Sequence, residues 1–155
     1  MSTGNRPDIT VRTARAEDLE TLVAHNLAMA RETEGRELDP ETVRAGTREL
    51  LEQTRRGFYL LAELPEGPAG QLMVTYEWSD WRNGDFWWIQ SVYVRPDARR
   101  RGVFSALLRW LVERAGSDAR VCGLRLYVHR ENSTAQHTYR RLGLQPAPYL
   151  MYERD

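Results

Sequence analysis

Residues 86–94 form a nearly continuous apolar stretch, which constrains the fold more than any other part of the sequence. Only Gln90 and Ser91 interrupt it, and both side chains are uncharged. A strand that is apolar on both faces is usually central in its sheet and covered on both sides. An Asn-Gly dipeptide at residues 83–84 favours a hairpin with residues 71–78. We therefore expect helices on both faces of a sheet that contains this strand.

Apolar spacing, helix caps and turn residues predict the remaining elements. Strands are expected at residues 9–12, 58–64, 71–78, 86–94, 121–128 and 149–153, and helices begin near Glu17, Asp39, Gly102 and Asn132. This order places antiparallel hairpins before a β-α-β crossover, so the fold class is α/β in the broad sense, or α+β. The length of 155 residues fits one domain, expected over residues 9–155 after a flexible tail at residues 1–8.

Composition excludes several classes of function. The 22 basic residues balance 22 acidic ones, which argues against nucleic-acid binding through bulk charge. All the basic residues are arginine, which excludes mechanisms that need a phosphate-loop or Schiff-base lysine. A single cysteine, Cys122, and three histidines argue against disulfides and a metal site. The sequence has neither a long apolar run nor an apolar leader, so we expect a cytoplasmic protein without a membrane partner.

An arginine run follows the central strand and leads directly into a helix. Arg99, Arg100 and Arg101 precede Gly102, where the helix is expected to start. The first N–H groups of a helix have no internal partner and carry the positive end of its dipole, which favours an anion. Gly102 would let the backbone approach a diphosphate closely. The alternative is an ordinary turn between strand and helix with solvated arginines.

Two spaced motifs indicate one family. The stretch Arg99-Arg100-Arg101-Gly102-Val103-Phe104 matches a loop that reads Arg/Gln-x-x-Gly-x-Gly/Ala, except at Phe104. The pattern Asn-x-x-Ala-x-x-x-Tyr-x-x-x-Gly-Phe/Leu is matched by Asn132, Ala135, Tyr139, Gly143 and Leu144. The chain therefore resembles the GNAT superfamily of acetyl-CoA-dependent N-acyltransferases. Residues 76–94 are most similar to its diamine (spermidine/spermine and thialysine) acetyltransferase branch.

The resemblance implies a mixed, mostly antiparallel, twisted sheet of six to seven strands flanked by about four helices. It also implies direct transfer of an acetyl group from acetyl-CoA to a primary amine in a ternary complex. The central strand would part from residues 124–128, leaving a gap for pantetheine and a backbone N–H for the oxyanion. The cofactor contacts that it implies are Val92, Tyr93, Val94, Arg99, Arg100, Arg101, Gly102, Val103, Phe104, Ser105, Asn132 and Ala135. No metal is expected.

Tyr139 is the predicted catalytic residue. The resemblance implies that its hydroxyl lies beside the CoA sulfur, where a phenol can protonate the leaving thiolate. The alternative is a core tyrosine, which the spacing with Ala135 and Leu142 also allows. Asn132 would contact pantetheine, or only cap its helix, or do both. A non-catalytic acyl-CoA-binding module or sensor is the alternative function, and the phenol at position 139 argues against it.

The acceptor site and the proton acceptor are less defined. The diamine branch has adjacent acidic residues where this chain has Gln90 and Ser91. The candidates for contact with the acceptor, a small amine or peptide amine, are Glu32, Glu34, Glu77, Trp78 and Gln90. Glu32, Glu34, Glu77 or His129 would relay the amine proton, although an exposed loop explains the first two and a capping or surface role explains His129. The tryptophans of the 78–88 region could hold a cation, but core packing or a homodimer face is the favoured interpretation.

Overall fold

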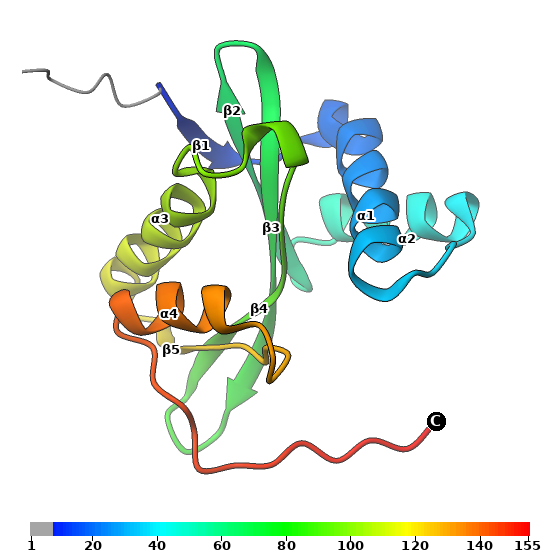
Figure 1. Ribbon diagram of the computed structural model, residues 1–155. Helices are drawn as coiled ribbons and strands as arrows, with labels where there is room; N and C mark the ends of the chain where they lie inside the picture. Colours follow the sequence, from blue (N-terminus) through cyan, green and yellow to red (C-terminus); the bar gives the residue numbers. More distant parts are fainter. Residues whose placement is uncertain (1–7) are drawn as a thin grey trace, which may run out of the picture.

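The computed structural model describes residues 8–155, so nearly all of the tail expected at residues 1–8 lies outside the described residues. The strands are β1 (Thr10–Thr13), β2 (Gly57–Leu64), β3 (Gly67–Ser79), β4 (Gly84–Val94) and β5 (Val121–Arg125). The helices are α1 (Leu19–Glu34), α2 (Pro40–Glu52), α3 (Val103–Ser117) and α4 (Ser133–Arg141), with short 3-10 turns at Ala16–Asp18 and Pro96–Ala98. Figure 1 shows the described chain.

The five strands form one mixed sheet in the order β1-β2-β3-β4-β5. The first three pairings are antiparallel, and β4 pairs with β5 in parallel. Helices α1 and α2 lie on one side of the sheet, and α3 and α4 lie on the other (Figure 1). The predicted α+β class and the four helices are therefore confirmed.

The prediction of a strand at residues 149–153 is wrong. Residues 144–155 form no helix or strand, and the C-terminal segment runs away from α4 without joining the sheet (Figure 1). The large side chains from Tyr149 to Tyr152 are 57–88% exposed. The segment does not pair with the open edge of β5, and apolar content alone does not make a strand, so the described residues give five strands and not six or seven.

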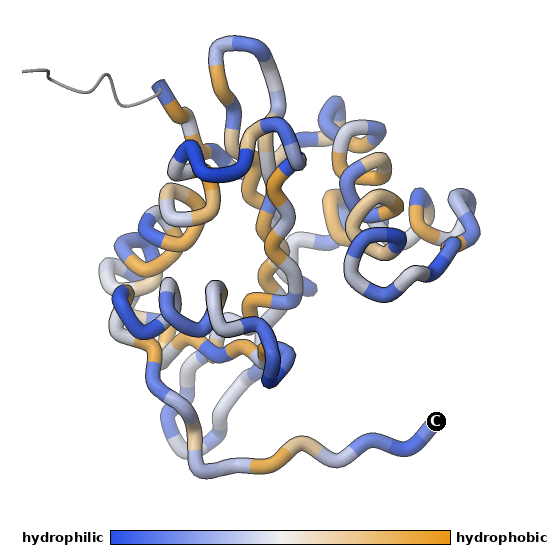
Figure 2. The backbone as a smooth tube through the Cα atoms, viewed as in Figure 1, coloured by the Kyte–Doolittle hydropathy of each residue, from blue (hydrophilic) through white to orange (hydrophobic). Residues whose placement is uncertain are grey.

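Each face of the sheet has its own apolar core. Leu60, Leu72, Val74 and Leu107 belong to the larger core, which α3 covers. Leu22, Leu50, Tyr59, Leu61 and Met73 form the smaller core beneath α1 and α2. Figure 2 shows apolar stretches along the central strands and on the helix sides that face them. Among residues 8–155, no helix is both long and apolar enough to cross a membrane.

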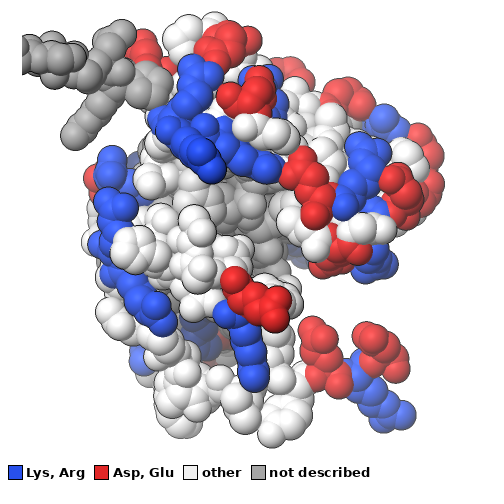
Figure 3. Space-filling view, in the orientation of Figure 1, with Lys and Arg blue, Asp and Glu red and all other residues white. Residues whose placement is uncertain are grey.

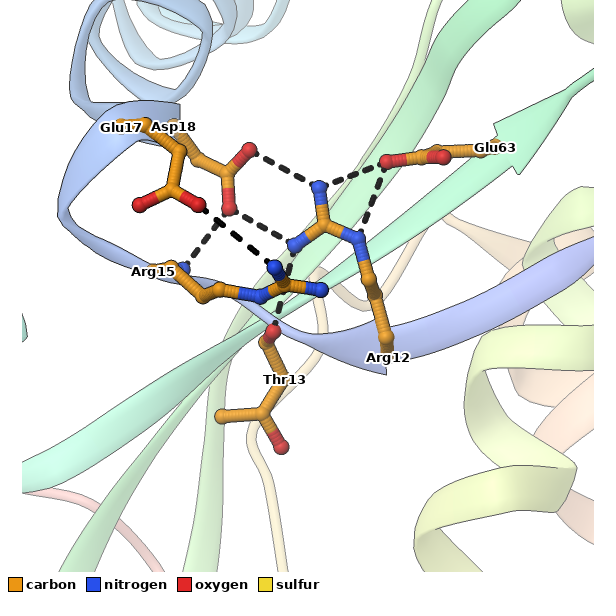
Figure 4. Close-up of polar contacts among 6 residues, drawn as sticks. All are labelled: Arg12, Thr13, Arg15, Glu17, Asp18 and Glu63. Carbon is orange, nitrogen blue, oxygen red and sulfur yellow. Dashed lines mark hydrogen bonds and ion pairs between the residues drawn. The ribbon is translucent and has the colours of Figure 1, made fainter.

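A forked ion pair ties β1 to β2 and to the start of α1 (Figure 4). The Arg12 guanidinium donates to both carboxylate oxygens of Asp18, at 2.8 and 2.9 Å, and to Glu63 at 2.6 Å. Asp18 also accepts the backbone N–H of Arg15 at 2.7 Å. The hydrogen bond from Arg12 lowers the pKa of Asp18, although burial opposes the shift. The pair therefore fixes where α1 begins relative to the sheet.

Candidate active site

Strands β4 and β5 pair over only part of their length. Their register runs from Asp85 with Val121 to Trp88 with Arg125, and no pair joins them beyond that point. The rest of β4 continues to Val94, while the chain after Arg125 leaves the sheet toward α4. The edge of β4 beyond Trp88 is therefore free of a neighbouring strand on this side. The parting expected between these two strands is present, although β5 ends at Arg125 and not at residue 128.

A bulge in β4 lies at the start of this opening. Met73 pairs with Ser91 and Val74 pairs with Ile89, which leaves Gln90 as an extra residue. The Gln90 amide donates to the Thr75 hydroxyl at 2.7 Å. The extra residue changes the alternation of the strand, so that Ile89 and Val92 both pack on the α3 side. Bulges re-aim a strand locally and are common beside active sites.

The turn before α3 presents unpaired N–H groups. Gly102 is the N-cap with φ +87°, and Arg100 also has a positive φ of +62°. The first helical hydrogen bond runs from the Ala106 N–H to the Gly102 carbonyl at 3.0 Å. The three N–H groups of residues 103–105 therefore have no intrahelical acceptor. A Cβ on Gly102 would meet only Ile9, at 3.7 Å, so the approach to this turn is open apart from the φ strain.

Arginine side chains surround the turn, as Figure 3 shows over the N-terminal end of α3. Arg101 forms an ion pair with Glu66. Arg99 donates its Nε to the Val94 carbonyl at 3.0 Å and an Nη to Glu32 at 2.5 Å. Within the described part of the chain, Arg100 forms no ion pair and is exposed. The positive charge needed for an anion site is thus present, but two of the arginines are held by carboxylates.

Tyr139 lies on α4, the helix that follows β5. Asn132 caps this helix, because its Oδ1 accepts the Ala135 N–H at 3.1 Å. The Tyr139 ring packs on the larger core, 5.9 Å from the ring of Phe104. Burial raises the pKa of Tyr139, so the phenol stays protonated at neutral pH. Its hydroxyl donates to no described residue, and the side chain lines a cavity of about 920 Å³.

That cavity lies beside the outer edge of β5. Leu124 of β5, Tyr139 of α4 and Met151 of the C-terminal segment are among its lining residues. Trp88 and Tyr127 also line it, with ring centroids 6.3 Å apart. Tyr139 therefore faces an open space of a size that accommodates a ligand.

Only one of the acidic candidates joins the loop and the central strand. Glu32, in the last turn of α1, contacts Arg99 and accepts the Tyr93 hydroxyl at 3.3 Å. Glu34 is paired with Arg36 at 3.5 Å and is 61% exposed. Glu77 is paired with Arg125 at 2.6 Å. The structure thus brings Glu32, Tyr93 and Arg99 together and leaves Glu34 and Glu77 apart from them.

The other candidates are accounted for locally. Trp78 is 63% exposed on β3, and Gln90 is engaged with Thr75. His129 lies in the loop before α4, where its Nδ1 accepts the Glu131 N–H at 3.3 Å. This geometry matches the capping role considered for His129. Among the described residues, no group of three or more His, Cys, Asp or Glu side chains could hold a metal ion.

A buried polar chain behind Tyr93 was not foreseen. His25 of α1 contacts Gln71 of β3 at 2.9 Å, and Gln71 donates to Asn26 at 3.0 Å. The His25 ring lies 5.2 Å from the Tyr93 ring, and burial lowers the pKa of His25. Neutral His25 and Gln71 thus support Tyr93 from the α1 side. Gln71 within an apolar strand and His25 on the apolar side of its helix were the available signals.

Comparison with known proteins gives consistent matches. A family model described as "Acetyltransferase (GNAT) family" matches residues 20–144. A possible acetyltransferase from Clostridium difficile 630 is 43% identical, with 95% of this chain and 97% of that chain covered and a TM-score of 0.88. An aminoglycoside N-acetyltransferase, AAC(6')-Iy, in complex with CoA is 16% identical, with 99% of both chains covered and a TM-score of 0.75, which shows a shared fold. No curated protein sequence matches the chain.

Proposed function

Because the chain belongs to the acetyltransferase (GNAT) family, we propose that it transfers the acetyl group of acetyl-CoA to a primary amine at the opening between β4 and β5. Enzymes of this family are acetyl-CoA-dependent acyltransferases of class EC 2.3.1. The observation that carries the proposal is the juxtaposition of a free β4 edge, an open helix N-terminus and a protonated tyrosine. No metal is needed for this chemistry.

The diphosphate of acetyl-CoA binds at the turn before α3. The free N–H groups of Val103, Phe104 and Ser105 point toward it, and the positive end of the helix dipole favours its charge. Arg99, Arg100 and Arg101 add positive charge, and Gly102 leaves room for close approach. The bulky side chain of Phe104 fits this role because it packs on Tyr139 and contributes only its N–H.

The pantetheine arm lies along the free edge of β4. The backbone groups of residues 92–94 that point away from β3 are directed to its amides, since β5 does not pair with this part of the strand, and the Val94 carbonyl among them already accepts from Arg99. At the other side, Asn132 uses its Oδ1 for capping and keeps its amide N–H groups available, next to Ala135. An N–H of residues 92–94 stabilises the oxyanion that develops on the thioester carbonyl.

The transfer is a direct displacement. The neutral amine nitrogen attacks the thioester carbon, a C–N bond forms, and the C–S bond breaks as the electron pair moves to sulfur. Tyr139 supplies a proton to the thiolate, the amine releases one proton to water, and the Tyr139 phenolate regains a proton from water, so the charges balance. Its raised pKa keeps the Tyr139 proton in place until the sulfur takes it. Glu32 is a weaker base than an unpaired carboxylate while it contacts Arg99, because that contact lowers its pKa.

The acceptor class is proposed from the sequence of β3 and β4. The similarity of residues 76–94 to the diamine acetyltransferases favours a small polyamine. Gln90 and Ser91 replace the acidic pair of that branch, so the charge that holds a cationic acceptor must come from elsewhere in the site. A non-catalytic acyl-CoA-binding module is the second candidate, and the protonated Tyr139, which lines the cavity beside β5, disfavours it.

We further propose that the protein is a homodimer. Among residues 8–155 no strand pairs with the outer edge of β5, and the extended C-terminal segment has four largely exposed side chains, Tyr149, Leu150, Met151 and Tyr152. Each chain thus has an unpaired strand edge and an exposed apolar segment that pairs with no strand. A second copy of the chain can cover both. Trp81, 93% exposed at the β3–β4 turn, adds apolar surface.

The experiment that tests the function is an acceptor panel. Spermidine, lysine, an aminoglycoside and a short peptide are each mixed with acetyl-CoA and enzyme, and thiol release is measured. We expect turnover with at least one amine and mass-spectrometric detection of its acetylated product. Tight CoA binding together with no turnover for every amine would instead support the non-catalytic module.

A further inference from the structure

Glu32 links the two halves of the proposed site. Its Oε2 accepts the Arg99 guanidinium at 2.5 Å, and its Oε1 accepts the Tyr93 hydroxyl at 3.3 Å. Arg99 belongs to the turn before α3, Tyr93 to β4, and Glu32 to the end of α1. The contact between Glu32 and Arg99 spans 67 positions of the sequence, so it joins parts of the molecule that the fold brings together.

The position of Glu32 is unfavourable for the binding of acetyl-CoA. Its carboxylate neutralises an arginine of the turn that is proposed to hold the diphosphate. It also places a negative charge beside the turn where the diphosphate is proposed to bind, and like charges repel. Both groups of the ion pair are partly exposed, with 47% of the Arg99 side chain and 36% of the Glu32 side chain accessible. The pair can therefore open without unfolding its surroundings, with loss of the hydrogen bond from the Arg99 Nε to the Val94 carbonyl.

When the Arg99 guanidinium moves away from Glu32, the charge changes on the side of the site where the acceptor is proposed to bind. With Arg99 drawn to the diphosphate, Glu32 keeps only the Tyr93 hydroxyl, and its negative charge is uncompensated. A carboxylate in that state attracts an ammonium group. Glu77 cannot serve in the same way, since its partner Arg125 lies on β5 and not in the turn before α3.

We propose that Glu32 binds a cationic group of the acceptor, and that Arg99 blocks this site until acetyl-CoA draws the guanidinium away. The inference rests on the proposed function and adds an order to it: acetyl-CoA binds first and creates the ammonium site. Coupling of this kind is reciprocal at equilibrium, so a bound cationic acceptor also strengthens the binding of CoA.

The test uses Glu32→Gln, with Glu37→Gln as the matched control. Glu37 lies in the α1–α2 connection shortly after Glu32, pairs with Arg31 at 3.6 Å and is 77% exposed. In titration calorimetry with CoA alone, Glu32→Gln should bind CoA at least about 3-fold more tightly than wild type, because a repelling charge is removed. The KM of the best amine of the panel should rise by about 10-fold, since its ion-pair partner is lost. Glu37→Gln should change neither quantity.

The outcomes separate this inference from the function on which it rests. If Glu32→Gln binds CoA more weakly or equally well, Glu32 merely supports Arg99, and the inference is wrong. If wild-type protein does not bind CoA, the proposed function itself fails. If Glu32→Gln does not fold, the wild-type protein decides the question. The same amine must then bind at least about 5-fold more tightly with saturating CoA than without CoA. Equal amine affinity with and without CoA would overturn the inference.

Discussion

The ring of Phe104 lies 5.9 Å from the ring of Tyr139, in a tilted arrangement. Phe104 is the one residue of the phosphate-loop motif that departs from the expected pattern, and Tyr139 is the proposed acid. The side chain that could have obstructed the turn is thus directed into the larger core. Phe104 therefore connects the turn before α3 to Tyr139 on α4.

We predict that Phe104→Ala leaves CoA binding at the turn before α3 nearly unchanged and impairs catalysis by Tyr139. The backbone N–H at position 104 remains, so CoA affinity should stay within about 3-fold of wild type, less than 1 kcal/mol. Loss of the ring should reduce stability by about 1–3 kcal/mol and loosen Tyr139, which lowers kcat. Calorimetry and steady-state kinetics on the same preparation measure both effects. A large loss of CoA affinity with normal kcat would contradict this assignment.

Gly102→Glu should block the diphosphate site. The substitution strains a position at φ +87° and directs a carboxylate toward the phosphates. CoA affinity should fall at least about 10-fold, or roughly 1.4 kcal/mol. Gly116→Glu, near the other end of α3 with open space around it, is the matched control and should bind CoA normally. Unchanged affinity in folded Gly102→Glu would rule out this turn as the binding site.

Leu150→Arg should dissociate the proposed homodimer. Leu150 is 72% exposed in the single chain, so a charged side chain there has no folding cost within one protomer. Light scattering of the wild type should give the mass of two 18.0 kDa chains, and the variant should give that of one. A wild type that is a single 18.0 kDa species at micromolar concentration would refute the dimer.

The Arg12–Asp18 pair should make stability depend on pH at the acid end. Arg12 lowers the pKa of Asp18 in the folded state, so the pair stabilises the protein above the unfolded pKa of about 4. That contribution is lost as the pH falls through the lower folded value. Asp18→Asn should therefore lower Tm at pH 7 and flatten its fall below about pH 4. Glu17→Gln, which alters an exposed pair with 3.6 Å separation, should keep the wild-type profile.

Local signals in the sequence predicted most of the fold. The N-caps Asp39 and Asn132 were recognised because capping depends on residue type and short spacing, and both accept the expected N–H groups. Gly102 was likewise placed at the start of α3. The expected strand at residues 149–153 is wrong because a strand forms only when the segment pairs with a sheet edge, and a local pattern does not reveal that residues 149–153 stay unpaired with β5.

The site was predictable only where a motif described it. The turn before α3 is predicted as an anion site from its own residues and Tyr139 as the acid from the resemblance, while the contact of Glu32 with Arg99 joins residues too far apart in sequence for any spacing rule. The contact of His25 with Gln71 was missed for a related reason. A glutamine in a strand suggests an outward side chain, and only the packed α1 helix reveals that Gln71 is completely buried.

The most direct test of acetyl transfer at this site is the kcat of Tyr139→Phe with the best amine of the panel. The substitution removes only the hydroxyl and keeps the ring that packs against Phe104. A general acid contributes about 10²–10⁴ in rate, so kcat should fall by at least about two orders of magnitude while CoA affinity is unchanged. Because burial raises the pKa of Tyr139, a high-pH limb set by this phenol should lie above pH ~10 in the wild type and be absent from the variant. Near-native turnover by Tyr139→Phe would contradict the account and reduce Tyr139 to a core residue.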